Sequence, residues 1–312
     1  MTAPIVQPTP EAITRAAEIL RAGGLVAMPT ETVYGLAANA ADAPAIARLF
    51  EAKGRPRFNP LIAHVADLTI ARQQGQFSAN ALSLAEAFWP GPLTLITDTA
   101  PTIAVCDLAR AGLDSVALRI PAHPVAQALL AAFGAPLVAP SANPSGQISP
   151  TTANHVAADM GDRIDLILDG GPCRAGIEST IIDTRTDQPI LLRLGSLDPA
   201  QINAVWPGMT RAQGNPDAPQ SPGQLLRHYA PSAALRLNAQ ASQPGEGYLG
   251  FGPGPCDLNL SPTGNLSEAA SNIFAMLRAL DTAHTRIAVA PIPDQGLGEA
   301  INDRLTRAAK DD

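Results

Sequence analysis

The sequence predicts an α/β protein with one main sheet, followed by a smaller α/β unit of the open-sheet type. Helical patterns and short apolar strands alternate along the first two thirds of the chain, which is typical of helices packed on a sheet. A turn-rich stretch without apolar periodicity, at 211–224, precedes a second and shorter alternation. We therefore expect a first domain over residues 1–205, a linker over 206–231 and a small C-terminal domain over 232–312.

The first helix is predicted from its ends and its spacing. Thr9 suits the capping position and Pro10 the first helical position, and Gly23 and Gly24 end the helix. Apolar residues between these ends recur with helical spacing. Further helices are expected at about 42–50, 81–88, 124–133, 266–280 and 298–309. Strands are expected at 25–28, 61–65, 93–97, 116–120, 136–139, 166–168, 179–183, 190–194, 234–237, 247–251 and 287–290.

Composition limits the classes of function. The chain has 312 residues, 46% of them hydrophobic and 16% charged, which is enough apolar material for a sizeable core. Its net charge is −7, with 21 Lys+Arg against 28 Asp+Glu. Proteins that hold nucleic acid tightly present a basic surface, so we expect no stable nucleic-acid binding. A local basic pocket for a nucleotide remains compatible with this charge.

The three cysteines are far apart and form no C-x-x-C pair. They predict neither a disulfide framework nor a cysteine zinc site, and they fit reduced thiols in a cytoplasm. No signal peptide is recognised at the N-terminus, and no apolar stretch reaches the roughly 18 residues of a membrane span. We expect a cytoplasmic protein that neither contacts a membrane nor binds a metal through its own side chains.

No common nucleotide motif is present, neither the P-loop nor the dinucleotide or kinase glycine patterns, so any ATP site must be built differently. One polar block, 29–36, follows an apolar strand, where open α/β sheets place ligands. A capping turn accounts for it equally well. A second block places Lys53, Arg55 and Arg57 within five residues, which suits a polyphosphate. A helix C-terminus would explain Lys53, but not the arginines that follow Gly54.

Three further features have both a structural and a functional interpretation. Ser141 and Asn143 follow another strand and are able to hold a phosphate or a ribose, although a plain loop would look the same. His64 interrupts an apolar strand and is either a ligand or a structural histidine. Arg193 closes an apolar strand, where an arginine needs an anionic partner.

Taken in order, seven blocks resemble the YrdC-like family over nearly all of residues 10–200. They read PTETVYGL, KGRP with NPL and a histidine, WPGPLT, ALRIPAHP, APSANPSG, DGG and ESTI. The HYAP block that begins at His228 resembles the longer, two-domain form of this family, the threonylcarbamoyl-AMP synthases. The resemblance implies a twisted open sheet with a concave, locally basic cavity, and a small Rossmann-like C-terminal domain.

The resemblance also implies a nucleotidyltransferase reaction. L-Threonine and bicarbonate form a carbamate, which attacks the α-phosphorus of ATP and releases pyrophosphate. The product, threonylcarbamoyl-adenylate, is used by a downstream transferase to form N6-threonylcarbamoyladenosine in tRNAs that read ANN codons. Mg²⁺ is expected to arrive with the ATP.

The family's residues carry over to matching positions of this chain. Lys53 and Arg55 would be catalytic and neutralise the pyrophosphate. The nucleotide would be held by Arg55, Asn59, Ser115, Ser141, Asn143, Ser149, Arg193 and Tyr229. The threonine would be held by Thr32, His64, Arg119, Ala139 and Ser179. The linker around Tyr229 is expected to gate the cavity.

Three other interpretations compete. A nucleic-acid-binding module is disfavoured by the negative net charge. An enzyme that adenylates carbamoyl phosphate normally carries further modules with paired CxxC motifs, which this sequence lacks. A regulator with an inactive site is disfavoured because both signature pairs, K-x-R and S-x-N, are intact.

Overall fold

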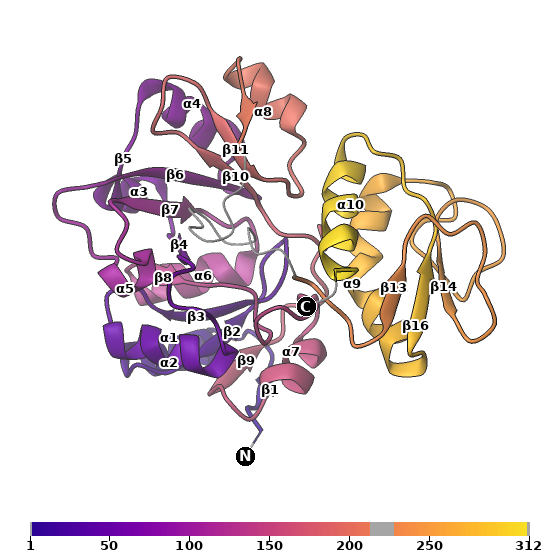
Figure 1. Ribbon diagram of the computed structural model, residues 1–312. Helices are drawn as coiled ribbons and strands as arrows, with labels where there is room; N and C mark the ends of the chain where they lie inside the picture. Colours follow the sequence, from indigo (N-terminus) through magenta and orange to yellow (C-terminus); the bar gives the residue numbers. More distant parts are fainter. Residues whose placement is uncertain (1, 213–227, 311–312) are drawn as a thin grey trace.

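The computed structural model describes residues 2–212 and 228–310, which form two sheets (Figure 1). We call residues 2–212 the large unit and residues 228–310 the small unit. The larger sheet has 12 strands and mixes parallel and antiparallel pairs. Its order is β1 (Ile5–Val6), β9 (Leu166–Leu168), β2 (Val26–Met28), β3 (Gly35–Asn39), β8 (Leu137–Val138), β4 (Ile62–His64), β7 (Ser115–Arg119), β6 (Leu93–Thr99), β10 (Thr180–Asp183), β11 (Ile190–Arg193) and β12 (Thr210–Arg211), with β5 (Gly75–Gln76) beside β6.

The helices of the large unit cover this sheet, and their ends follow local rules. Thr9 Oγ1 accepts the Ala12 N–H at 3.2 Å at the start of the first helix, as its capping role predicts. The second helix ends at Gly54, whose φ of 58° is the left-handed conformation that glycine adopts freely. The helices are α1 (Pro10–Arg21), α2 (Ala43–Lys53), α3 (Leu68–Gln74), α4 (Ala79–Phe88), α5 (Asp107–Arg110), α6 (Pro124–Phe133), α7 (Ala153–Met160) and α8 (Pro199–Val205).

The sequence patterns did not predict every element. Helices α3, α7 and α8 are seven or eight residues long, too short to show a clear apolar period. Strand β12 lies inside the stretch expected to be linker and pairs with β11 in parallel. The rest of the turn-rich stretch, 213–224, lies outside the described residues.

The small unit is a parallel sheet with helices on one face. The strand order is β13 (Ala234–Arg236), β16 (Arg286–Val289), β14 (Gly247–Gly250) and β15 (Leu258–Asn259). Its helices α9 (Leu266–Ala283) and α10 (Leu297–Ala308) lie between this sheet and the large unit (Figure 1). The expected α/β fold with a twisted open sheet and a small second α/β unit is confirmed.

Successive side chains of a strand point to opposite faces of the sheet, so β7 has one face in the main core and another that carries polar residues. On β7, Val116 and Leu118 point into the main hydrophobic core. Ser115, Ala117 and Arg119 therefore share the opposite face. Ala117 there joins a small apolar cluster with residues of the neighbouring strands β4, β6 and β10. This face carries the candidate site. Within residues 2–212 and 228–310, no helix combines the length and the apolar character needed to cross a bilayer.

Candidate functional site

A cavity of about 50 Å³ lies on the polar face of the larger sheet. Most of the residues predicted from the sequence line it: Thr32, Arg55, His64, Arg119, Ala139, Ser141, Ser179, Arg193 and Tyr229. The structure adds lining residues that the sequence analysis did not select: Val33, Ile62, Pro140, Glu178 and His228. The predicted residues Lys53, Asn59, Ser115, Asn143 and Ser149 do not line it.

Sheet register explains why distant blocks meet here. Strands β4 and β7 are parallel, and His64 is paired with Arg119 at their carboxyl ends. Two residues earlier, Ile62 is paired with Ala117, which gives the cavity an apolar floor. Ser115 lies on the same face of β7 as Arg119, but about 13 Å away along the strand. Predicted nucleotide and threonine residues therefore lie at opposite ends of one strand.

Arg119 is the centre of the predicted threonine site. It donates from Nη2 to Glu31 Oε1 at 2.6 Å, from Nη1 to Thr32 Oγ1 at 3.0 Å and from Nε to the Gly91 carbonyl at 3.3 Å. A guanidinium has five N–H groups, so two remain for a ligand carboxylate. Burial alone would raise the pKa of Glu31, but the charge of Arg119 lowers it, so the carboxylate is ionised. The sequence analysis placed Glu31 inside a polar block but gave it no role.

Arg55 and Arg193 form a second, unneutralised group of cations. Arg55 donates from Nη2 to the Pro60 carbonyl at 3.1 Å, and Arg193 donates from Nη2 to the Ser179 carbonyl at 2.9 Å. Neither forms an ion pair with any carboxylate that the structure describes. Burial, followed by the charge of Arg193, lowers the pKa of Arg55 to about 10, which still leaves it protonated at neutral pH. A buried and a half-buried cation without an ion-pair partner are suited to bind an anion.

Lys53, predicted to neutralise the pyrophosphate, contacts the loop that carries Ser141 and Asn143. Its Nζ donates to the Ser141 carbonyl at 2.6 Å and to the Asn143 carbonyl, so it holds the 141–143 loop from behind the cavity. Burial and the charge of Arg55 lower the pKa of Lys53. This contact joins the K-x-R block to the S-x-N block in the folded chain.

Two buried asparagines have polar atoms that lack a partner. Both side-chain atoms of Asn59 and the Oδ1 of Asn143 make no hydrogen bond with any described residue. Buried polar groups are almost always paired, so such atoms indicate groups that a ligand or water completes. Ser149 is satisfied instead by the protein, since its hydroxyl donates to Glu178 Oε1 at 2.6 Å.

Residues 228–230, which we call the plug segment, contribute His228 and Tyr229 to the cavity wall. Ala230 N–H donates to the Gly146 carbonyl at 2.9 Å, and the Tyr229 ring stacks on Phe274 of α9 with centroids 5.5 Å apart. Tyr229 has a φ of 64°, which is uncommon outside glycine. A space of about 50 Å³ holds one or two waters. This space is smaller than the pockets that usually hold ligands of nucleotide size.

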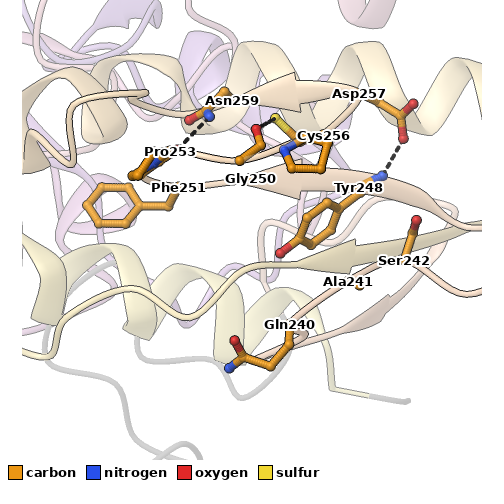
Figure 2. Close-up of a pocket in the computed structure, with 13 residues that line it drawn as sticks. Gln240, Ala241, Ser242, Tyr248, Gly250, Phe251, Pro253, Cys256, Asp257 and Asn259 are labelled. Carbon is orange, nitrogen blue, oxygen red and sulfur yellow. Dashed lines mark hydrogen bonds between the residues drawn. The ribbon is translucent and has the colours of Figure 1, made fainter.

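Larger hollows lie elsewhere on the protein. One of about 520 Å³ lies on the small unit, around the loop that follows β14 (Figure 2). Its Asp257 accepts the Tyr248 N–H at 2.7 Å, and its Asn259 donates to the Gly252 carbonyl at 2.8 Å (Figure 2). Among the side chains that line the smaller cavity, His228 has a buried ring nitrogen, Nδ1, without a hydrogen-bond partner in the described residues.

Within the described ranges, no three His, Cys, Asp or Glu side chains are placed to hold a metal ion. The two carboxylates beside the cavity are already paired, Glu31 with Arg119 and Glu178 with Arg304.

These features define an α/β protein with a cation-lined cavity on a mixed sheet, to whose wall the first residues of the small unit contribute. Residues 18–195 match the family model of the Sua5, YciO and YrdC proteins, described as "Telomere recombination". Residues 197–310 match the model described as "Threonylcarbamoyl-AMP synthase, C-terminal domain". The chain belongs to the threonylcarbamoyl-AMP synthase family and is an enzyme.

Individual relatives match over almost the whole chain. The threonylcarbamoyl-AMP synthase of Bacillus subtilis is 40% identical, over 95% of this chain and 92% of its own length. That of Pyrococcus abyssi is also 40% identical, over 94% and 93% respectively. The crystal structure of P. abyssi Sua5 complexed with L-threonine superposes with a TM-score of 0.90 at 36% identity, and covers 99% of this chain and 97% of that one.

Proposed function

We propose that this enzyme is an L-threonylcarbamoyladenylate synthase. It condenses L-threonine, bicarbonate and ATP to threonylcarbamoyl-AMP and pyrophosphate, and is thus a nucleotidyltransferase. One observation carries the proposal: two cations without an ion-pair partner among the described residues, the buried Arg55 and the half-buried Arg193, line one cavity with Arg119. Arg119 has two N–H groups that remain for a ligand. The cavity thus offers one place for phosphates and another for an amino-acid carboxylate.

The threonine would bind at the end of β7. Arg119 binds its carboxylate through the remaining N–H groups, and the Thr32 hydroxyl lies beside it. His64 Nδ1 lies 3.2 Å from the Ile62 carbonyl oxygen, which is able only to accept, so Nδ1 carries the proton and Nε2 is an acceptor. Burial lowers the pKa of His64 to about 3. A neutral His64 then accepts a hydrogen bond from the threonine.

The reaction needs alignment more than a dedicated base. A carbamate is already an anionic nucleophile, so the site has to place it against the α-phosphorus and stabilise the leaving pyrophosphate. Arg55 and Arg193 supply that charge. Lys53 contributes by fixing the loop that carries Ser141 and Asn143.

Mg²⁺ would enter as part of the nucleotide substrate. Glu31 and Glu178, beside the cavity, are both held by arginines, so the described residues 2–212 and 228–310 offer this ion no free carboxylate there. Mg²⁺ commonly keeps several waters and binds through substrate phosphates, which suits this arrangement.

The product would pass to a separate transferase that modifies tRNA reading ANN codons, in the cytoplasm. The net charge of −7 supports a division of labour in which another protein holds the tRNA.

The test is pyrophosphate release by the full chain with Mg²⁺ and ATP, with L-threonine and bicarbonate added singly and together. Mass spectrometry identifies the adduct. We expect release only when both are present, with an adduct of the mass of threonylcarbamoyl-adenylate. Release that is independent of threonine, or none under any combination, would refute the proposal.

A further inference from the structure

Arg304 connects the small unit to the cavity of the large unit. It lies on α10, is 1% exposed, and donates from Nε to Glu178 Oε2 at 3.1 Å. Its Cζ lies 5.4 Å from the centre of the Tyr229 ring. It therefore contacts one side chain of the cavity wall and one of the plug segment, although 126 residues separate it from Glu178.

Glu178 is a negative charge beside the anion site. Burial alone would raise its pKa, but the charges of Arg304 and then Arg193 lower it, so Glu178 is ionised. An unpaired carboxylate here would repel phosphates and would compete with them for Arg193.

We propose that Arg304 is a positioning residue of the nucleotide site: it pairs with Glu178 and so leaves Arg193 available for phosphate. The inference rests on the proposed function, because it takes ATP as the anion. It also gives the small unit a part in the reaction, since that unit supplies the neutralising cation from α10.

The packing of α9 against the large unit fixes the position of Arg304 relative to Glu178. Gly176 lies two residues before Glu178 with a φ of 72°, and a Cβ there would lie 2.3 Å from the Ala270 carbonyl oxygen of α9. The helix backbone thus packs directly on the turn that carries Glu178. Phe274, one helical turn further along α9, stacks on Tyr229. The small unit is therefore held against Glu178 and Tyr229, the two side chains of the cavity that Arg304 contacts. Its third partner, Asp303 at 3.1 Å, is the preceding residue of α10.

The experiment is calorimetric titration of the full chain with ATP. The variants are Arg304→Gln, Arg304→Lys, Glu178→Gln and the double variant Glu178→Gln/Arg304→Gln. The matched control is Arg211→Gln, which breaks a different ion pair between the units, with Glu299 of α10. Thermal unfolding of each variant shows that it is folded at the titration temperature.

We expect Arg304→Gln to weaken ATP binding by about tenfold or more, the scale of one charged interaction. Arg304→Lys keeps the charge and should stay within about threefold of the wild type. In the double variant the carboxylate is neutral, so its ATP affinity should also return to within about threefold. Arg211→Gln should leave the affinity unchanged. If the role of Arg304 were purely structural, the second change at Glu178 would not restore the ATP affinity.

Two results would overturn the inference: Arg304→Gln binding ATP as the wild type does, or the double variant binding it as weakly as Arg304→Gln. If Arg304→Gln does not fold, the double variant is compared with the wild type instead, and an ATP affinity about tenfold weaker than that of the wild type overturns the inference. A wild-type chain that binds ATP but makes no adenylate would contradict only the proposed function. Wild-type catalysis together with an unaltered Arg304→Gln variant would contradict only this inference.

Discussion

Replacing Glu31 by alanine tests whether the buried pair with Arg119 builds the threonine site. The change removes the acceptor of two contacts, Arg119 Nη2 at 2.6 Å and Ala122 N–H at 3.0 Å. Arg119 is 4% exposed, so its charge would remain buried without a carboxylate. Breaking a buried pair by removing one partner typically costs about 3–5 kcal/mol.

That cost corresponds to a clear shift in a thermal scan. At about 2–4 °C per kcal/mol for a unit of this size, the unfolding midpoint of the large unit should fall by about 6–20 °C. The affinity for L-threonine should fall as well, because Arg119 loses the contact that orients it. Differential scanning calorimetry and threonine titration measure the two effects.

The matched control is Arg48→Ala, which removes an exposed ion pair. Arg48 lies 2.9 Å from Asp165, and the two side chains are 45% and 35% exposed. Exposed pairs contribute about 0–1 kcal/mol, so this variant should shift the midpoint by less than about 4 °C. If Glu31→Ala shifts it no further than Arg48→Ala does, the reasoning about the buried pair is refuted.

Three further predictions follow from the same geometry. Arg193→Gln should weaken ATP binding by about tenfold or more, because it removes a cation that forms no ion pair with a described carboxylate and is available to phosphate. Equal affinity in calorimetry would argue against a phosphate role. His64 has a folded pKa of about 3. Its ordinary value is near 6.5, so stability should fall as the pH drops below about 6.5, by about 2 kcal/mol at pH 5. In denaturant unfolding, His64→Asn should lose about 2 kcal/mol less stability between pH 7 and pH 5 than the wild type does. An equal dependence of the unfolding free energy on pH in the two proteins would contradict this prediction. Gly176→Ala should loosen the small unit and speed limited proteolysis, because its Cβ would meet α9 at 2.3 Å. The control is Gly171→Ala. Gly171 also has a positive φ, of 79°, but no atom lies within 4 Å of an added Cβ, so this variant measures the cost of backbone strain alone.

The sequence determined what depends on near neighbours. Thr9 and Pro10 begin α1 where their capping roles predict, and the helix buries the apolar residues that recur with its period. Capping and periodicity involve residues within a few positions of each other, so they are visible in the sequence itself. The ordered blocks also indicated which side chains to examine, and most of those selected line one cavity.

Only the tertiary structure decided how these side chains are paired. Lys53 is drawn to the carbonyls of the 141–143 loop, so it lies behind the cavity instead of lining it. Glu31 meets Arg119, and Glu178 meets Arg304 of the small unit. These partners are brought together by strand register and by the docking of α9 and α10, which join parts of the chain more than 80 residues apart. Local sequence patterns do not predict these ion pairs. A charged residue that becomes buried and paired is flanked by the same kinds of residues as one that stays in solvent.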